Sequence, residues 1–221
     1  MDKRKKLFLT TGILLLIAIV YTLLVKYYDV STIGPKNSAV GFSGINGLVH
    51  HALPYNEFWY KITKYLGIIS FLYCAFYGIQ GIVQIVKYKS IKKVDKRLIY
   101  LGAFYVVVLV VYFLFEKVVI NYRPFIIDVK EGLEASYPST HTLLACCVCA
   151  SSLLIAKYYI KKQNILKLFN YGTIVLMIIL VVGRLLSGVH WLTDIIGGII
   201  YSAVLVYLYY SFIYNNKKTR D

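Results

Sequence analysis

Charged residues are scarce in this sequence. Asp, Glu, Lys and Arg make up 16% of its 221 residues, whereas soluble domains carry roughly 25%. Hydrophobic residues make up 59% and the mean hydropathy is +0.65, which excludes an ordinary soluble domain and a disordered chain. Four cysteines are too few for a disulfide scaffold of this length. These shortages leave a polytopic membrane protein.

Acidic residues are rarer still, because 10 Asp and Glu stand against 25 Lys and Arg, a formal net charge of +15. An excess of this size can indicate a nucleic-acid-binding protein. The basic residues, however, gather in four short segments, 3–6, 87–97, 157–167 and 217–220, that alternate with long uncharged runs. Cytoplasmic loops of membrane proteins have this distribution. We therefore expect no nucleic-acid partner, and no pattern in the sequence indicates a protein partner.

Six uncharged runs are close to or above the length of about 20 residues that crosses a bilayer. The sequence predicts an all-α, polytopic membrane protein, with a six-transmembrane-helix bundle in a single integral-membrane domain over residues 1–221. We expect an outer interfacial segment between the first and second helices, at 29–64, with His50 and His51 on its surface. The expected spans are approximately 7–27, 65–86, 98–120, 138–159, 168–187 and 190–214.

The distribution of charge also predicts the orientation of the chain. An even number of spans places both termini on one side of the membrane. The two tails and the two even-numbered connections hold 17 basic and 3 acidic residues, and the rest of the chain holds 8 and 7. By the positive-inside rule, both termini are cytoplasmic and the chain is a multi-pass protein of the cell (plasma) membrane.

The four cysteines all fall inside the expected spans, at Cys74, Cys146, Cys147 and Cys149. A zinc site at the last three is the alternative interpretation. It is disfavoured because their spacing on a helix points the sulfur atoms in different directions and no paired ligand group accompanies them. We expect small buried apolar side chains instead.

Polar residues from distant parts of the sequence are expected at the outer ends of the third to sixth spans. Each alone has an ordinary explanation, such as a lysine that reaches the headgroups. Charges at bilayer depth are nonetheless costly unless paired or facing water, which makes them functional candidates. Together they supply three cations, two imidazoles and one carboxylate, a set suited to binding and attacking a phosphate: Lys117, Arg123, His141, Arg184, His190 and Asp194.

Residue choice supports a phosphate site. The chain has five Arg against twenty Lys, and the two Arg outside the cytoplasmic segments, Arg123 and Arg184, both belong to this set. A guanidinium binds phosphate oxygens in a bidentate manner. Pro138 suits the first turn of a helix, where Ser139 and the free backbone N–H groups would form an anion site.

His190 and Asp194 are four positions apart, which places them on one face of a helix. A carboxylate there can keep one imidazole nitrogen protonated and leave the other free as a nucleophile. The alternative is a structural His–Asp pair at a helix start. A cysteine placed at Ser136, in the outer loop before the fourth span, is expected to react with a membrane-impermeant, cysteine-reactive label from outside the cell.

Three segments resemble the three-part signature of the type 2 phosphatidic acid phosphatase family, which includes the vanadium haloperoxidases. They are Lys117-x5-Arg123-Pro124, Pro138-Ser139-Thr140-His141 and Gly183-Arg184-x5-His190-x3-Asp194. The resemblance implies that His190 is the nucleophile, that Asp194 orients it and that His141 is the general acid. It implies no metal and no cofactor. It also implies a substrate-binding set of Lys117, Arg123, Ser139, the Thr140 backbone N–H and Arg184.

Three positions differ from the family pattern. Five residues, rather than the usual six, separate Lys117 from Arg123, Thr140 stands where glycine is usual, and Gly183 stands where serine is usual. None of these differences removes a group that makes or breaks a bond. We expect activity to persist, with effects on the rate or the substrate range at most.

The resemblance implies metal-independent hydrolysis of a lipid phosphate or diphosphate at the outer membrane face through a phosphohistidine. It suggests that the substrate is undecaprenyl diphosphate, phosphatidylglycerol phosphate or phosphatidic acid. Each is a membrane lipid that would enter the site from the lipid bilayer. Two alternatives remain open: a lipid-head phosphotransferase that uses the same site, and a non-enzymatic anion-binding membrane protein. Release of inorganic phosphate would separate hydrolysis from transfer, and the effect of His190→Ala would separate an enzyme from a binding protein.

Overall fold

The computed structural model describes residues 3–130 and 132–215. Six helices in this part of the chain are long and apolar enough to cross a membrane, and a short helix and two 3₁₀ turns accompany them, while no β-strand forms there. The prediction of an all-α protein with six spans is confirmed. The helices are α1 (Lys3–Tyr27), α2 (Ser43–Ala52), α3 (Glu57–Tyr88), α4 (Lys96–Lys117), α5 (Thr140–Tyr159), α6 (Gln163–Leu186) and α7 (Leu192–Asn215), with 3₁₀ turns η1 (Pro35–Asn37) and η2 (Ile91–Lys93).

Helix α5 is the most enclosed span. It packs against α3, α4, α6 and α7, and 61% of its most apolar window is buried, against 11–44% for the other five. Its sequence explains this position, because small side chains let neighbouring helices approach closely in a membrane. The buried small residues include Ala145, Cys147, Cys149, Ser151 and Ser152. The three cysteines of α5 are free and buried, as expected, whereas Cys74 in α3 is free and only half-buried.

Helix α3 begins earlier than the expected start at residue 65. The Asn56 side chain accepts a hydrogen bond from the Trp59 N–H at 3.1 Å and caps the helix. Glu57 in the first turn is favourable at the positive end of the helix dipole. The lysines had suggested a later start, but Lys61 lies on the helix, ion-paired to Glu57 at 2.8 Å.

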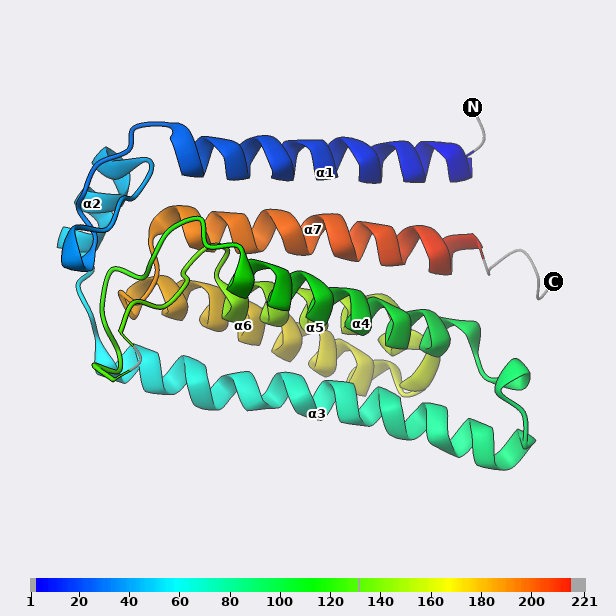
Figure 1. Cartoon of the computed structure of the whole chain (residues 1–221). Coiled ribbons are helices and arrows are strands. Elements are labelled where there is room, and N and C mark those ends of the chain that lie inside the picture. Colours follow the sequence, from blue (N-terminus) through cyan, green and yellow to red (C-terminus); the bar gives the residue numbers. More distant parts are fainter. Residues whose placement is uncertain (1–2, 131, 216–221) are drawn as a thin grey trace.

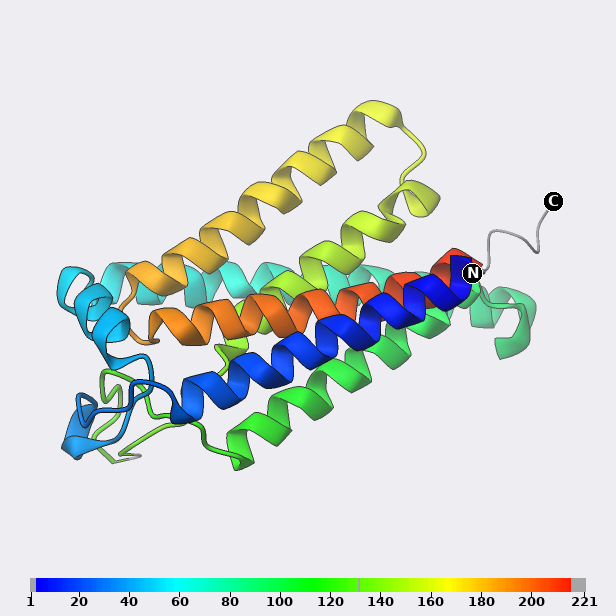
Figure 2. The same ribbon diagram turned by 90° about the horizontal axis from the view of Figure 1, so that it is seen from above.

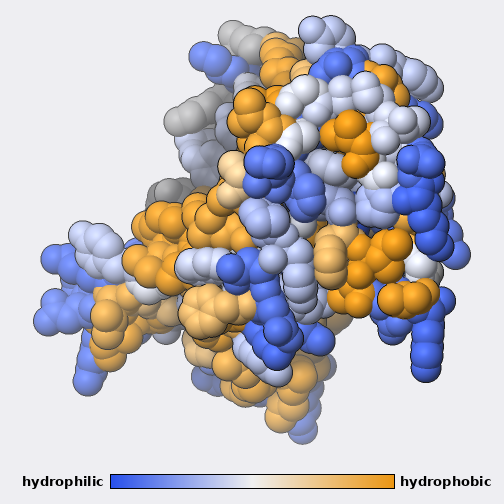
Figure 3. Space-filling view, turned by 90° about the vertical axis from the view of Figure 1, so that its left-hand side faces the viewer, coloured by the Kyte–Doolittle hydropathy of each residue, from blue (hydrophilic) through white to orange (hydrophobic). Residues whose placement is uncertain are grey.

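The start of α1 and the last turns of α7 lie at one end of the bundle, and α1 and α7 run side by side (Figures 1 and 2). The opposite end carries α2, the loop 118–139 and the turn between α6 and α7. We call this the loop end. Figure 3 looks onto it and shows hydrophilic and apolar side chains intermixed.

Helix α2 is attached to the start of α7 through one buried side chain. Asn46 donates hydrogen bonds to the Gly41 carbonyl at 2.8 Å and to Thr193 Oγ1 at 2.9 Å, and accepts one from the Thr193 N–H at 3.2 Å. The expected segment between the first two spans is therefore partly helical and is fixed against the helix that carries Asp194.

Candidate active site

His190 lies in the turn that joins α6 to α7. Gly188 in this turn has a φ of +64°, a conformation that favours glycine. A Cβ at Gly188 would lie 2.5 Å from the backbone of Pro54, so the α2–α3 connection packs directly on the turn. The turn ends at α7, whose first turn contains Asp194. The expected pair thus stands at the loop end of the bundle.

Asp194 is completely buried and has three hydrogen-bond donors on its carboxylate. Ser136 Oγ donates to Oδ2 at 2.5 Å, the Trp191 N–H donates to Oδ2 at 2.9 Å, and Asn121 Nδ2 donates to Oδ1 at 3.1 Å. The Asp194 carbonyl also accepts from the Ser139 N–H at 2.9 Å. Because buried charge is tolerated only when it is well hydrogen-bonded, this set of donors favours an ionised carboxylate.

The contact between Asp194 and His190 is not direct. Asp194 Oδ2 lies 3.8 Å from His190 Nδ1, whereas Ser136 Oγ lies 3.1 Å from the same nitrogen. His190 lies in the turn before α7, so the prediction that both side chains share one face of a helix is wrong. The turn still brings the two side chains together, and the Ser136 side chain stands between them.

The loop 118–139 brings two residues to the site that the sequence interpretation missed. Asn121 and Ser136 meet at its base, where the Ser136 N–H donates to the Asn121 carbonyl at 3.0 Å. Ser136 is only 2% exposed, so the expectation that an external label would reach it is wrong. The sequence gives little indication of either residue. Asn121 lies two residues before Arg123 and Ser136 two residues before Pro138, and Asn and Ser are common at such loop positions.

Arg184 connects α6 to α5 and α3. Its Nη2 donates to His141 Nδ1 at 3.2 Å and its Nη1 to Thr63 Oγ1 at 3.4 Å. The guanidinium carbon lies 5.2 Å from the centre of the Tyr60 ring, within cation–π range. A guanidinium carries donors only, so His141 accepts through Nδ1 and is neutral at that nitrogen.

Thr63 also explains why Gly183 can replace the usual serine. A Cβ at Gly183 would lie 2.7 Å from Thr63 Cγ2 and 3.1 Å from the Trp59 ring. The space that a serine side chain would use is therefore filled from α3. The hydroxyl that contacts Arg184 comes from Thr63 instead.

Arg123 is held by Glu134 across the loop. Its Nη2 lies 3.2 Å from Glu134 Oε2, and its N–H donates to the Glu134 carbonyl at 3.0 Å. Arg123 Nε is buried and has no partner in the described residues. The ion pair orients the guanidinium and leaves its buried Nε–H free to donate.

Two cations and burial keep His190 neutral. Burial is the larger cause, and the charges of Arg123 and Arg184 add to it, so the pKa of His190 lies well below its usual value near 6.5. His190 Nε2, Arg123 Nε and Arg184 Nε are all buried without a hydrogen-bond partner in the described part of the chain. Buried polar atoms are rarely left unpaired, and the oxygens of a bound phosphate could accept from the two guanidinium donors.

Ser139 and Thr140 form the start of α5. Ser139 is fully buried, does not cap the helix with its side chain, and accepts a hydrogen bond from Thr142 Oγ1 at 3.1 Å. Its own hydroxyl proton remains available for donation. Thr140 is the first residue of the helix, where backbone N–H groups have no acceptor within the helix. Both residues can therefore donate to an anion.

Lys117 is the predicted site residue that the structure does not bring to the others. It is the last residue of α4, its side chain is exposed, and it makes no hydrogen bond or ion pair with the described residues. The shortened spacing to Arg123 is the reason, because a shift of one position turns a helical side chain by about 100°. Glu116 occupies the position that the usual spacing would give to lysine.

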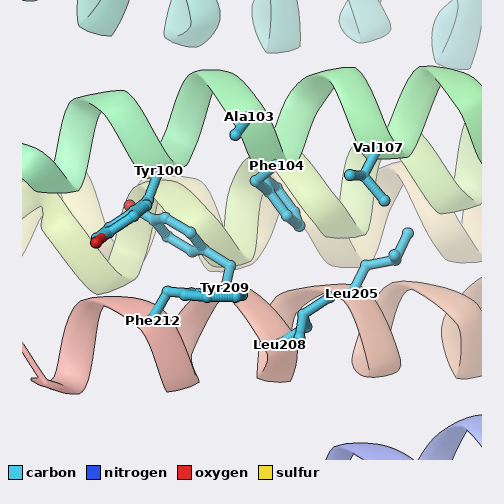
Figure 4. A pocket seen from close by; sticks show the side chains of 8 residues that line it. All are labelled: Tyr100, Ala103, Phe104, Val107, Leu205, Leu208, Tyr209 and Phe212. Atoms are coloured by element: carbon cyan, nitrogen blue, oxygen red, sulfur yellow. The ribbon is translucent and has the colours of Figure 1, made fainter.

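Cavities and possible ligand clusters elsewhere do not compete with this site. No group of three His, Cys, Asp or Glu residues in the described segments lies close enough to hold a metal ion. A cavity of about 340 Å³ lies between α4 and α7, and Figure 4 shows apolar side chains and tyrosines lining it, from Tyr100 to Phe212. Tyr100 follows the start of α4 and Phe212 precedes the end of α7, so this cavity lies toward the end of the bundle away from His190.

Comparison with known proteins agrees with the geometry. The family model of the PAP2 superfamily matches residues 96–218, more than half of the chain. The fold is similar to the crystal structure of the first transmembrane PAP2 type phosphatidylglycerolphosphate phosphatase from Bacillus subtilis, with a TM-score of 0.58, 19% identity and 100% coverage of both chains. No curated protein matches the chain in sequence. The chain belongs to the PAP2 superfamily, and its family and fold indicate a membrane phosphatase.

Proposed function

We propose that the chain hydrolyses a lipid phosphate monoester or diphosphate without a metal ion, through attack by His190 Nε2 on phosphorus. The observation that carries this proposal is the set of three buried, unpartnered nitrogens on His190, Arg123 and Arg184. A neutral imidazole can attack, and two guanidinium groups can hold the phosphoryl oxygens. This arrangement suits phosphoryl transfer, which depends mainly on positioning and charge stabilisation.

The proposed reaction has two displacements. His190 Nε2 forms a bond to phosphorus as the bond to the leaving oxygen breaks, and His141 gives that oxygen a proton. Water then attacks the phosphohistidine, gives its proton to His141 and releases His190 with inorganic phosphate. The His141 contact with Arg184 fits this cycle, because a bound phosphate gives Arg184 another acceptor and frees His141 Nδ1 to hold a proton.

Ser139 and the Thr140 N–H complete the proposed phosphate site from the start of α5. Positive partial charge at a helix start favours an anion there. Asp194 acts on His190 from the side away from the phosphate. Lys117 stands at the loop end beside this site, and it remains a proposed substrate contact only if its exposed side chain reaches the phosphate when lipid binds.

The proposed substrate is a membrane lipid. The site lies at the end of a bundle whose outer helix faces are apolar, so a lipid headgroup can reach it from the bilayer. Undecaprenyl diphosphate, phosphatidylglycerol phosphate and phosphatidic acid are the proposed candidates. The similar solved structure carries the name of a phosphatidylglycerolphosphate phosphatase, which makes that lipid the first to assay. Positive charge at the opposite end supports an outward-facing site.

The test is phosphate release by the purified protein in detergent, with each of the three lipids and with a chelator present. His190→Ala should lower turnover more than about 10³-fold, because loss of a nucleophile removes the main reaction path. His51→Ala, at an exposed position of α2, is the matched control and should retain full activity. Loss of turnover with chelator would contradict the metal-free mechanism, and phosphate found on a second lipid would indicate a phosphotransferase.

A further inference from the structure

The Ser136 hydroxyl occupies the only short path between the Asp194 carboxylate and the His190 ring in the described residues. It lies 2.5 Å from Asp194 Oδ2 and 3.1 Å from His190 Nδ1. The direct distance from Oδ2 to Nδ1 is 3.8 Å, which is too long for a hydrogen bond. The hydrogen-bonded link from the carboxylate to the imidazole therefore passes through Ser136.

The direction of each proton follows from the number of donors. A serine hydroxyl has one proton, and an ionised carboxylate can only accept. Ser136 therefore donates its proton to Asp194. Its lone pair then faces His190 Nδ1, so that nitrogen must carry the ring proton. A neutral imidazole protonated at Nδ1 has its free lone pair at Nε2, the buried nitrogen without a partner.

We propose that Ser136 is a positioning residue that links Asp194 to His190 and fixes the imidazole tautomer. This rests on the proposed function, in which His190 Nε2 is the nucleophile. The Ser136 backbone holds the loop independently, because its N–H donates to the Asn121 carbonyl. Removal of the hydroxyl alone therefore leaves the loop closed.

The experiment compares Ser136→Ala with the wild type and with Ser202→Ala. Ser202 is a similarly buried serine of α7 whose hydroxyl donates to the Ile199 carbonyl of its own helix and contacts Cys146 of α5, away from His190 and Asp194. We expect Ser136→Ala to lower kcat about 10- to 100-fold, as loss of a group that orients a functional histidine does, with KM changed less than about 2-fold. Ser202→Ala should match the wild type.

The second readout is independent of turnover. Nitrogen NMR of labelled protein without substrate reports the protonation of each ring nitrogen, and His190→Gln identifies the His190 signals. The wild type should show His190 protonated at Nδ1, and Ser136→Ala should show a mixture of tautomers. An unchanged tautomer together with wild-type kcat would overturn the proposal. A wild type that shows the Nδ1–H tautomer but releases no phosphate would instead contradict the proposed function.

A separate observation concerns the cation that Lys117 does not supply. Tyr60, Thr63 and Lys64 stand at positions i, i+3 and i+4 of α3 and so share one face. Tyr60 and Thr63 both contact Arg184. Lys64 lies close enough to His141 for its ammonium to interact electrostatically with that imidazole. This face of α3 is a wall of the site.

Lys64 is also free to bind an anion. It is exposed and has no ion-pair partner in the described residues, whereas Lys61, one turn earlier, is paired with Glu57. It lies about two turns into a membrane-spanning helix, where an unpaired charge is costly unless it faces water or a ligand. We infer that Lys64 is a third phosphate-binding cation beside Arg123 and Arg184, which also rests on the proposed function.

Binding of inorganic phosphate to the purified protein tests this inference without turnover. Lys64→Ala should raise the phosphate Kd about 10-fold, because a hydrogen bond to a charged group contributes a binding free energy equivalent to roughly that factor. The KM for lipid should rise in parallel. Lys61→Ala is the matched control on the same helix and should leave both unchanged. The inference would be overturned if Lys117→Ala raised the phosphate Kd and Lys64→Ala left it unchanged. The role of third cation would then belong to Lys117.

Discussion

At the residue scale, the charge state of His190 decides when the site can react. Burial, reinforced by Arg123 and Arg184, holds the pKa of this imidazole well below 6.5. A nucleophile must be unprotonated, so a lowered pKa keeps His190 competent at neutral pH and inactivates it only in more acidic solution. The sequence identifies His190 and its neighbours, but the pKa depends on burial, which the sequence does not show.

We therefore expect kcat/KM to stay constant as the pH falls through 6.5 and to decline only below it, since kcat/KM reports groups of the free enzyme. Arg123→Gln should move the acid limb to higher pH, because removal of a nearby cation favours the imidazolium. The measurement is the pH profile of phosphate release for both proteins. An acid limb above pH 6.5 in the wild type would contradict a neutral, buried His190.

At the scale of single elements, the packing of α3 on α6 replaces a missing side chain. Gly183 leaves room for Thr63, and the Thr63 hydroxyl contacts Arg184. The sequence alone shows only that a serine is replaced by glycine. The compensating residue is 120 positions earlier in the chain, beyond the reach of any local pattern, and only the packed helices bring the two positions together.

Gly183→Ala should lower the melting temperature of the purified protein, because the new Cβ would lie 2.7 Å from Thr63 Cγ2 and overpacking costs about 1–3 kcal/mol. Thr63→Ser removes that methyl group and keeps the hydroxyl, so the double variant should recover part of the loss. Gly172→Ala, also on α6 with no atom within 4 Å of its Cβ, is the control. Equal melting temperatures for the two alanine variants would rule out the close contact.

Helix α2 is the second element with a defined role, because Asn46 ties it to α7. Asn46→Ala would leave the Thr193 N–H and the Gly41 carbonyl without a buried partner, which costs about 1–3 kcal/mol. We expect a lower melting temperature and reduced turnover, since α7 carries Asp194. Leu48→Ala, at a position 68% exposed on the same helix, should change neither quantity. Full activity in Asn46→Ala would show that α2 does not support the site.

At the scale of the whole molecule, the start of α1 and the end of α7 lie at the end of the bundle opposite the loop end, which carries the site (Figure 1). The excess of basic residues at the terminal end predicts that this end is cytoplasmic. The proposed substrate would then be a lipid of the outer leaflet. The structure shows the two ends, and the membrane side of each remains a prediction.

Cysteine labelling in intact cells tests the orientation. A membrane-impermeant reagent should label Val129→Cys, at a position 87% exposed in the loop 118–139, from outside. Lys92→Cys, in the exposed turn between α3 and α4, should react only after lysis. Three of the four native cysteines are buried and Cys74 is half-buried within α3, which keeps background labelling low. The reverse pattern would place the site on the cytoplasmic face.

The sequence by itself determined the six spans, a separate segment between the first two, and several of the polar residues at the loop end, among them His141, Arg184 and Asp194. Hydrophobic length and the alternation of charge are local properties, and a bilayer converts them directly into topology. Within the spans, His141, Arg184 and Asp194 follow from which end of each helix they occupy. The start of α3 did not follow, because charge near its first turns masked a capped helix.

Only the tertiary structure decided how the side chains meet. It placed Ser136 between His190 and Asp194, set Thr63 against Gly183, and left Lys117 exposed at the end of α4. These relations join residues that are far apart in the chain or depend on a rotation of one helical position. Contact through space is determined by packing, which requires the positions of several helices at once, and no periodicity along one segment contains that information.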